Sequence, residues 1–234
     1  MTTCRVAARV DRLRRARLYL VIAGLADDDG KPDGAMAPSA LLRAFDAGVD
    51  AVQLRMKGVP TQKIAEQALR LRALLRARPT LIFVNDDYEA AIAGRADGVH
   101  LGQEDAPIER VRQKVGPDLL IGLSTHSLKQ AQGARARGAD YIGVGSMFPT
   151  ATKDGAKVVG PEVLPKILRS ARVPVFPIGG IDVRNVERIV AQGAGRAAIA
   201  RAIVRAEDPA QAARVLRFVL ERAPLVDAMT GTGE

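Results

Sequence analysis

The strongest constraint on the fold is an alternation of short apolar runs with longer segments of helical period. The runs are rich in Val, Ile and Leu and lack strict polar alternation, which is typical of strands that are buried on both faces. Eight such runs occur, at residues 18–23, 51–55, 81–84, 98–101, 119–124, 141–144, 174–178 and 196–200. No proline- or serine-rich linker interrupts the series, so we predict a single folded domain.

The segments between the runs have the pattern of amphipathic helices. In residues 61–76 (TQKIAEQALRLRALLR), one stripe is apolar and arginines occupy the other face. The stripe consists of Ile64, Ala68, Leu71, Leu74 and Leu75. Glycines precede several of the apolar runs and are predicted to end the helices, namely Gly48, Gly94, Gly138 and Gly193. Three of these lie in similar phrases, AGVDAVQL, RGADYIGV and AGAGRAAI.

Eight strand–helix units in a chain of 234 residues match the number and size of a (β/α)₈ TIM barrel. A doubly wound open sheet would use five or six strands and leave residues over. We therefore predict a barrel domain over 18–225, after a basic N-terminal extension (1–17) and before a flexible tail (226–234). The chemistry of such a barrel belongs to the loops at the C-terminal ends of its strands.

The N-terminal residues and the composition limit the class of protein. The Arg-rich start and the apolar residues after it loosely resemble a signal peptide, but the apolar stretch contains strand formers and no clean cleavage site follows it. A short basic helix before the first strand is preferred, with a cytoplasmic location. No apolar run approaches the roughly 20 residues of a membrane-spanning helix. A single cysteine, Cys4, excludes a disulfide framework and a cysteine-rich zinc module.

Cations follow the second predicted strand. Gln53, Arg55 and Lys57 alternate in sequence and so share one face at the strand end. Arginine and lysine together suit a phosphate or a diphosphate, the first as a fork and the second as a point charge. The alternative is ordinary solvated charge.

Carboxylates follow the third and fourth predicted strands. Asp86 and Asp105 are candidate Mg²⁺ ligands, because a hard cation is commonly held by one or two carboxylates together with substrate phosphates and water. Asp87 and Glu104 are instead predicted to cap the helices that follow them.

Ser124 ends the fifth run and His126 follows two residues later. No nucleophile elbow surrounds them, so a hydrogen bond from Ser124 to substrate is favoured over covalent catalysis. His126 is predicted to open a helix, and His100 to have a structural role at a strand end. Two histidines with no third nitrogen or sulfur ligand make a poor zinc site.

The remaining candidate residues lie in the last three loops. The loop after the sixth run carries Thr150, Thr152 and Lys153, which are either anion-binding donors on a mobile lid or incidental groups of a flexible loop. Glycines follow the seventh run, and a helix start at Ala200-Arg201 follows the eighth. That combination forms the recurring phosphate site of this barrel class.

Taken in order, the motifs QLRMK, VNDD, GVHLGQED, GLSTH, FPTATKDG and PIGGI resemble those of the thiamine phosphate synthase family, over residues 18–203. The resemblance implies a Mg²⁺-dependent transferase in a (β/α)₈ barrel. That enzyme joins a pyrimidine methyl diphosphate to a thiazole phosphate and releases diphosphate. We expect a dissociative reaction, in which the C–O bond of the methylene group breaks before the thiazole nitrogen attacks.

The resemblance also implies roles for individual residues. Lys57, Ser124 and Lys153 are the expected catalytic residues, and Asp86 and Asp105 the expected Mg²⁺ ligands. The expected pyrimidine diphosphate site consists of Gln53, Arg55, Lys57, Asn85, Ser124 and Lys153. The expected thiazole phosphate site consists of Thr150, Ala151, Thr152, Gly180, Ala200 and Arg201.

The chain departs from the family pattern in two places. An aliphatic residue followed by serine is common where this chain has Ala200-Arg201, although backbone donors would survive the change. The usual Thr-Asp after the first strand is replaced by Ile22-Ala23. An acidic loop follows and is interpreted as a solvated insertion, with Asp27, Asp28, Asp29 and Asp33.

The net charge of +9 suggests an anionic partner. Two phosphorylated small molecules are preferred to a nucleic acid, because the arginines are dispersed over helix faces and no RNA-recognition motif is present. Arg55, Lys57, Lys153 and Arg201 are assigned to substrate, and the other arginines chiefly to solubility. A thiazole tautomerase of the same fold is the alternative enzyme, but it typically lacks the paired acids. A membrane partner is not expected, and a homo-oligomer stays open.

Overall fold

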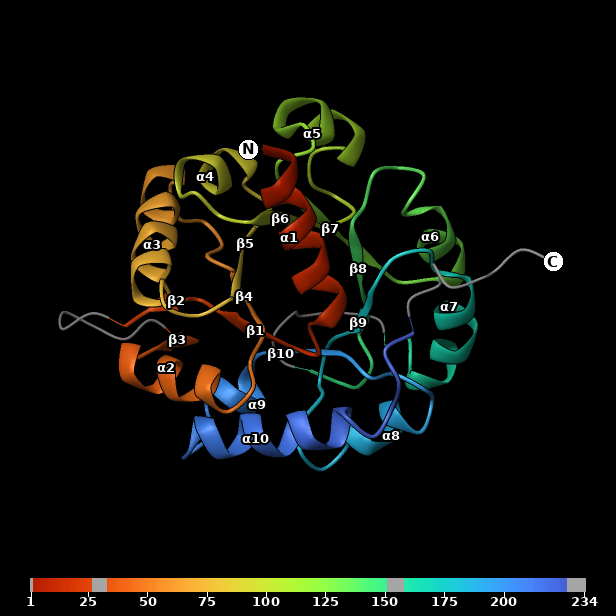
Figure 1. The fold of residues 1–234 in the computed structure, drawn as a ribbon. Helices are drawn as coiled ribbons and strands as arrows, with labels where there is room; N and C mark the ends of the chain where they lie inside the picture. Colours follow the sequence, from red (N-terminus) through yellow and green to blue (C-terminus); the bar gives the residue numbers. More distant parts are fainter. Residues whose placement is uncertain (1, 27–32, 151–157, 227–234) are drawn as a thin grey trace.

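Eight parallel strands form a closed ring, and helices surround it (Figure 1). This computed structural model describes residues 2–26, 33–150 and 158–226. Every one of the eight predicted runs overlaps a strand of the ring, which confirms the (β/α)₈ barrel. The strands are β1 (Leu18–Ile22), β4 (Ala51–Leu54), β5 (Leu81–Asn85), β6 (Gly98–Leu101), β7 (Leu120–Thr125), β8 (Tyr141–Val144), β9 (Val175–Pro177) and β10 (Ala197–Ile199).

The ring closes between its last and first strands. Each strand pairs with the next one along the chain, and β10 pairs with β1 with Leu18 opposite Ala197. A bridge between Ile178 and Ala198 joins β9 to β10. The short strands β2 (Gly24–Leu25) and β3 (Ala35–Met36) form a separate parallel pair after β1.

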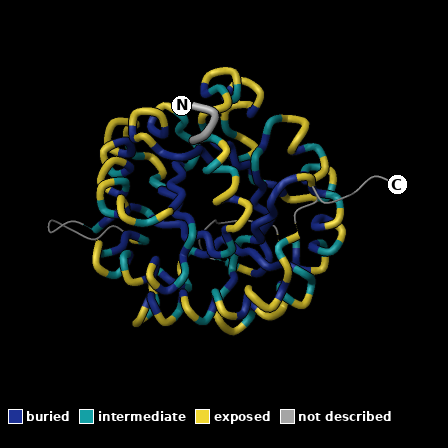
Figure 2. The backbone as a smooth tube through the Cα atoms, in the orientation of Figure 1, coloured by how far each residue is buried: buried dark blue, intermediate teal, exposed yellow. Residues whose placement is uncertain are grey.

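Helices bury their apolar stripes on the outside of the ring, and Figure 2 shows buried and exposed positions alternating along them. In α3 the predicted stripe is buried at Ile64, Ala68 and Leu71. None of the helices in the described residues is both long and apolar enough to cross a membrane. The helices after β1 are α2 (Pro38–Asp46), α3 (Thr61–Leu74), α4 (Tyr88–Ala93), α5 (Ile108–Val115), α6 (Leu128–Gly133), η1 (Pro161–Val163), α7 (Leu164–Ser170), α8 (Val186–Val190), α9 (Arg201–Val204) and α10 (Pro209–Leu220).

The predicted basic helix is α1 (Thr2–Arg15), and it lies across the N-terminal end of the barrel (Figure 1). Leu13 is buried there with the interior residues Ala51, Leu81 and Leu120, and Val10 packs against them. The predicted tail beyond Val226 lies outside the described residues.

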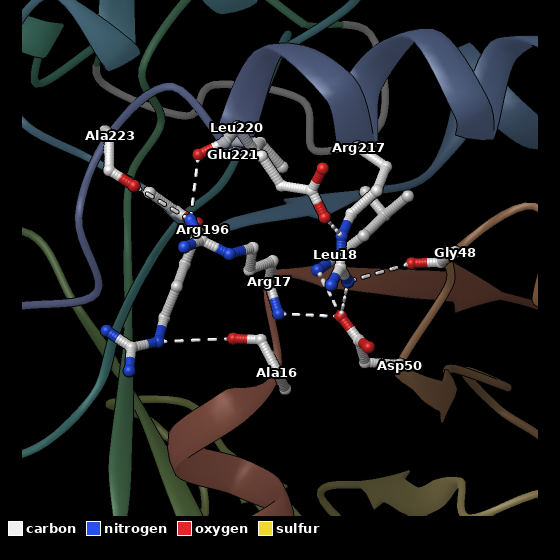
Figure 3. Close-up of polar contacts among 11 residues, drawn as sticks. Ala16, Arg17, Leu18, Gly48, Asp50, Arg196, Arg217, Leu220, Glu221 and Ala223 are labelled. Atoms are coloured by element: carbon white, nitrogen blue, oxygen red, sulfur yellow. Dashed lines mark hydrogen bonds and ion pairs between the residues drawn. The ribbon is translucent and has the colours of Figure 1, made fainter.

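An aspartate stands directly before three alternate strands and ties neighbouring elements together. Asp50 precedes β4 and accepts hydrogen bonds from the backbone N–H groups of Arg17 and Leu18 and from Arg217 (Figure 3). Asp97 and Asp140 do the same before β6 and β8, where they accept from Ile82 N–H and Ile121 N–H respectively. Each also pairs with at least one arginine, which balances a buried carboxylate at Asp97 and partly buried ones at Asp50 and Asp140.

An arginine takes the place of aspartate before the eighth strand of the ring. Arg196 is 2% exposed and donates to two carbonyls, that of Arg14 in the last turn of α1 and that of Ala16 just after the helix. Arg17 donates to the carbonyls of Gly195, Leu220 and Ala223, three acceptors contributed by distant segments (Figure 3). The expectation that arginines outside the site serve chiefly solubility is therefore wrong for these two, which join the ends of the chain to the barrel.

Three of the four glycines predicted to end helices have the left-handed conformation, with φ of 111° at Gly48, 104° at Gly138 and 89° at Gly193. Gly48 directly follows the C-cap of α2, whereas Gly138 and Gly193 lie in turns five and three residues after the ends of α6 and α8. The fourth differs. Gly94 ends α4 with φ −79°, and the next residue, Arg95, takes the left-handed conformation at φ 51°. A Cβ on Gly94 would lie 2.5 Å from the Ala68 side chain, so this glycine is required by the close approach of α3 and not by its own φ.

Aromatic rings fill the middle of the barrel. Tyr19, Phe83, Tyr141 and Phe176 are at most 1% exposed, with ring centroids 5.1–5.8 Å apart in their contacting pairs. Glycine makes room for them, since a Cβ on Gly122 would lie 2.1 Å from the Tyr141 ring. The interior is thus a packed core, and any substrate must bind above it at one end.

Candidate active site

Two adjoining cavities open at the C-terminal ends of the strands. The first has a volume of about 480 Å³, and its lining includes Gln53, Arg55, Asn85, His100, Thr150, Gly180, Ala200 and Arg201. The second has about 570 Å³ and includes Lys57. They share Arg55, Ala200, Arg201 and Arg205. The structure therefore brings most of the predicted site residues together at one end of the barrel.

The cations of this end come from both sides of the β1 strand. Arg55 and Lys57 follow β4, while Arg201 and Arg205 lie in and just after α9. Arg205 was not predicted, and it pairs with Asp33 at 2.6 Å. The sequence could have indicated Arg205, because it lies one helical turn after Arg201 and so shares its face of the helix. Asp33 is thus engaged in an ion pair, while Asp27, Asp28 and Asp29 lie outside the described residues.

Asp86 and Asp105, the predicted metal ligands, face each other although they follow different strands. Burial raises the pKa of the Asp86 carboxyl, and a hydrogen bond with Asp105 raises it further. Burial alone would raise the pKa of Asp105 too, but the hydrogen bonds from Asp86 and from the Gly102 N–H lower it overall. The ammonium of Lys57 forms an ion pair with Asp86. Asp86 adopts φ 64°, a left-handed conformation held by its N–H bond to the His100 carbonyl at 2.8 Å.

This donor set fits a hard divalent cation. Two facing carboxylates repel each other when both are ionised, and a cation bound between them removes that repulsion. Oxygen ligands in this number suit Mg²⁺, which keeps several waters or substrate oxygens in its shell. In the described residues no group of three or more His, Cys, Asp or Glu side chains converges on one point, so a site built by the protein alone is limited to this pair.

The two predicted helix caps differ in outcome. Asp87 caps α4, accepting from the Ala90 N–H at 2.8 Å, and Thr61 donates to its other oxygen. The prediction for Glu104 is wrong, because α5 begins at Ile108 after Pro107. The Pro107 ring disfavours a helical conformation in the residue before it, so the helix starts three residues later than a Glu104 cap would place it.

The opposite wall of the first cavity is made of backbone. Gly180 has φ 68°, and a Cβ there would lie 2.6 Å from the Pro149 carbonyl oxygen, so only glycine fits. Asn185 donates to the Gly180 carbonyl at 2.8 Å and holds the turn. Ala200 precedes α9 and cannot cap it by a side chain, which leaves N–H groups of the first turn for an anion. Thr150 lines this wall, whereas Ala151, Thr152 and Lys153 lie outside the described residues.

Ser124 is paired with a histidine other than its neighbour in sequence. Its Oγ lies 3.0 Å from Nε2 of His100, whereas His126 lies against the Gly145 carbonyl. The predicted structural role of His100 agrees with its burial, which lowers its pKa to about 4. His126 precedes α6, but Ser127 is the residue that caps the helix.

Tyr19 and Tyr141 were missed as polar members of the site. They lie directly beneath it and connect Gln53 to His100 by hydrogen bonds. The available signal was strand alternation, which places Tyr19 on the inward face together with Val21. The contact between the Tyr19 and Tyr141 hydroxyls across the barrel could not be predicted from the sequence.

A third cavity, of about 720 Å³, lies at the N-terminal end of the barrel beneath α1, and its lining includes Val10, Leu13, Arg112 and Pro174. It is the largest of the three, and one of the arginines in its lining already binds other groups of the protein. Arg112 donates to the carbonyls of Gly116, Leu119 and Gly138 and pairs with Asp140. The convergent cations and carboxylates therefore favour the C-terminal end as the active site.

Comparison with known proteins agrees with this geometry. The family model described as thiamine monophosphate synthase matches residues 18–203. The chain is 44% identical over 211 residues to the thiamine-phosphate synthase of Gloeobacter violaceus, covering 90% of this chain and 58% of that protein. It is 43% identical over 178 residues to that of Pyrococcus furiosus, covering 76% of this chain and 86% of the relative. The chain thus spans less than two thirds of the first relative and most of the second.

Solved structures give the same result for the fold. The thiamine phosphate pyrophosphorylase from Pyrococcus furiosus superposes with a TM-score of 0.77 and 38% identity, over 90% of this chain and 97% of that one. A 3-hexulose-6-phosphate synthase superposes with a TM-score of 0.58 at 24% identity, over 87% and 99%. The second likeness concerns the barrel alone.

Proposed function

Because this chain belongs to the thiamine monophosphate synthase family, we propose that it joins an aminopyrimidine methyl diphosphate to a thiazole phosphate. The products are thiamine phosphate and diphosphate. The observation that carries this proposal is the meeting of Arg55 and Lys57 with the facing carboxyls of Asp86 and Asp105 at the barrel end. Cations and a metal-binding pair at one place suit a leaving diphosphate.

The reaction needs no side-chain nucleophile. The bond between the methylene carbon and the diphosphate oxygen breaks, and the diphosphate leaves with the electron pair. The thiazole nitrogen then forms the new C–N bond with its own lone pair. We propose the dissociative order, with positive charge on the aminopyrimidine before attack.

The side chains act on charge and position. Arg55 and Lys57 would bind the diphosphate oxygens and stabilise the charge that develops on them. Asp86 and Asp105 would hold Mg²⁺, which neutralises the leaving group when bound. Asn85, Gln53 and Ser124 would orient the pyrimidine, since the first two line the cavity and Ser124 lies beside His100.

The glycine wall would bind the second substrate. Backbone donors around Gly180 and at the start of α9, with the Arg201 guanidinium, support a phosphate site on the far side of the first cavity. Thr150, Ala151 and Thr152 remain proposed contacts of the thiazole phosphate, and Lys153 a proposed catalytic contact of the diphosphate.

The proposal is tested by incubating the purified chain with the pyrimidine methyl diphosphate, the thiazole phosphate and Mg²⁺. Thiamine phosphate is measured as its fluorescent oxidation product, and EDTA should abolish its formation. Product that is insensitive to EDTA would contradict the metal assignment. Absence of product, together with conversion of a thiazole tautomer, would favour the tautomerase, which needs neither diphosphate nor metal.

A matched pair of lysine variants locates the activity. Lys57→Ala should lower turnover by roughly 100-fold or more, because a charge contact to the leaving group is lost. Lys114→Ala removes an exposed lysine at the C-terminal end of α5, away from the cavity, and should leave turnover unchanged. Equal turnover in the two variants would contradict the assignment of Lys57.

A further inference from the structure

A chain of five polar side chains crosses the barrel beneath the candidate active site. Gln53 Nε2 lies 3.1 Å from the Tyr19 hydroxyl, which lies 2.8 Å from the Tyr141 hydroxyl. Tyr141 lies 3.0 Å from Nδ1 of His100, and Nε2 of His100 lies 3.0 Å from Ser124 Oγ. We call these five residues the relay. It begins and ends at two side chains that are proposed to contact the pyrimidine.

Packing alone does not require the relay. Phe83 and Phe176 fill equivalent space in the same aromatic cluster without a hydroxyl. Burying the two tyrosine hydroxyls and an imidazole costs free energy unless every polar atom finds a partner. In the described residues no buried side-chain nitrogen or oxygen lacks one, so the network is complete. Its complete hydrogen bonding suggests that it orients the groups at its two ends.

The proton positions along the relay follow from its first donor. The Gln53 amide donates to the Tyr19 oxygen, and the buried Tyr19 proton needs an acceptor, which the Tyr141 oxygen at 2.8 Å provides. The Tyr141 proton is then directed to Nδ1 of His100. Because Nδ1 accepts this proton, it carries none of its own, so the His100 ring is neutral. A neutral ring that accepts at Nδ1 carries its single proton on Nε2 and donates it to Ser124.

Each end of the relay is thereby given one hydrogen-bonding role. Ser124 accepts from His100, so its own proton is free to point toward the substrate. The bond from one N–H of Gln53 to Tyr19 fixes the orientation of the amide, with Nε2 turned to the tyrosine and Oε1 available as an acceptor at the cavity that Gln53 lines. The site then offers an acceptor from β4 and a donor from β7.

We propose that His100, Tyr141 and Tyr19 are positioning residues that set Gln53 as acceptor and Ser124 as donor, and so select an aminopyrimidine over its oxo analogue. An exocyclic amine donates and the adjacent ring nitrogen accepts, which matches this pattern. In the oxo form the carbonyl accepts and the ring N–H donates, which opposes it. This inference rests on the proposed function for the identity of the ring, but the proton positions do not depend on it.

The proton positions are tested in the free protein. Long-range ¹⁵N–¹H NMR at pH 7 should show His100 neutral with the proton on Nε2. Tyr141→Phe removes the donor to Nδ1 and should shift the ¹⁵N resonance of that nitrogen. Tyr88→Phe is the matched control, because it deletes the same hydroxyl on α4, outside the relay. A proton on Nδ1, or a charged ring, would overturn the proposal.

Selectivity is tested by calorimetric binding of the aminopyrimidine methyl diphosphate and its oxo analogue to the intact chain. The unaltered protein should prefer the amine by about 10- to 100-fold or more, the effect of one unmatched buried hydrogen bond. Tyr141→Phe and Ser124→Ala should both reduce that preference, and Ser124→Ala should do so with the His100 proton still on Nε2.

The outcomes separate this inference from the proposed function. Unchanged preference in both variants, with lower thermal stability only, would show that the relay is merely structural and would overturn it. Failure of the unaltered chain to form thiamine phosphate would refute the proposed function instead, whatever proton position is found on His100.

Discussion

At the scale of single residues, the site depends on charges that hold one another in place. Lys57 and Asp105 act on Asp86 in opposite directions, since the cation lowers its pKa while the second carboxyl and burial raise it. Asp86 has a left-handed backbone with φ 64°, and its carboxyl forms a hydrogen bond with Asp105. Removal of one charge should therefore disturb the function of this cluster more than its fold.

Asp86→Asn should reduce turnover by orders of magnitude and weaken Mg²⁺ dependence, because a neutral amide is a poor ligand for a hard cation. Asparagine tolerates a left-handed φ, so the melting temperature should change little. Steady-state kinetics across Mg²⁺ concentrations measure the first effect and calorimetry the second. The control is Asp11→Asn, which makes the same chemical change at an exposed position of α1. Turnover near that of the control would rule out Asp86 as a ligand.

His100 predicts how stability depends on pH. Its pKa in the folded protein, about 4, is lower than the ordinary value of 6.5. The neutral ring is thus favoured by folding, and this contribution is complete above pH 6.5 and lost as the pH falls toward 4. The full loss amounts to about 3 kcal/mol.

Urea unfolding at several pH values in this range measures that loss. His100→Asn lacks the titrating ring and should show a smaller decrease in unfolding free energy as the pH falls, although its stability at neutral pH is lower. The carboxylates titrate in both proteins and cancel in the comparison. Parallel pH profiles for the two proteins would contradict a neutral buried His100.

At the scale of elements, the barrel is held by a position repeated before alternate strands. Asp50, Asp97 and Asp140 each link the start of one strand to the N–H groups of the strand before it. Arg196 occupies the same position before β10. It faces backbone carbonyls at the C-terminal end of α1, which accept hydrogen bonds and favour a cation. The residue type at each position therefore matches the backbone group it faces.

Asp97→Ala should destabilise the fold by about 3 kcal/mol or more, because Arg9 and Arg72 lose a buried partner at once. Asp46→Ala removes an exposed carboxylate paired with Arg78 and should cost about 1 kcal/mol or less. Chemical denaturation of both variants measures the difference. A cost for Asp97→Ala no larger than that of Asp46→Ala would contradict its structural role.

At the scale of the whole molecule, the +9 charge is divided among different tasks. Arg55, Lys57, Arg201 and Arg205 gather around the cavities. Several other arginines bind backbone carbonyls or aspartates in the shell of the barrel. Such a distribution favours small anionic substrates at one end, with weak attraction for anions elsewhere.

DNA should accordingly bind only weakly and without sequence preference. Binding of labelled duplex DNA, measured by fluorescence anisotropy, should be lost by roughly 200 mM salt, as expected for contacts with phosphate alone. Heparin, a sulfated polyanion, should compete equally well at low salt. Binding that survives this salt concentration would require a nucleic-acid function besides the proposed one.

The sequence by itself determined the barrel and most of the candidate site. Strands buried on both faces leave a strong periodic signal, and in a parallel barrel their C-terminal ends all meet at one face, so polar residues there are predicted to converge. The approach of Asp86 to Asp105 was predicted in this way. Asp87 was recognised as a cap because capping depends only on residues close in the chain.

Only the tertiary structure decided which side chains meet across the barrel. Ser124 pairs with His100 instead of the nearby His126, and Tyr19 reaches Tyr141 over 122 positions. Arg196 and Arg17 close the ring on carbonyls far away in the chain. Such contacts depend on register, on the space left by glycines such as Gly122, and on burial. None of these leaves a local pattern, because each is a property of several strands at once.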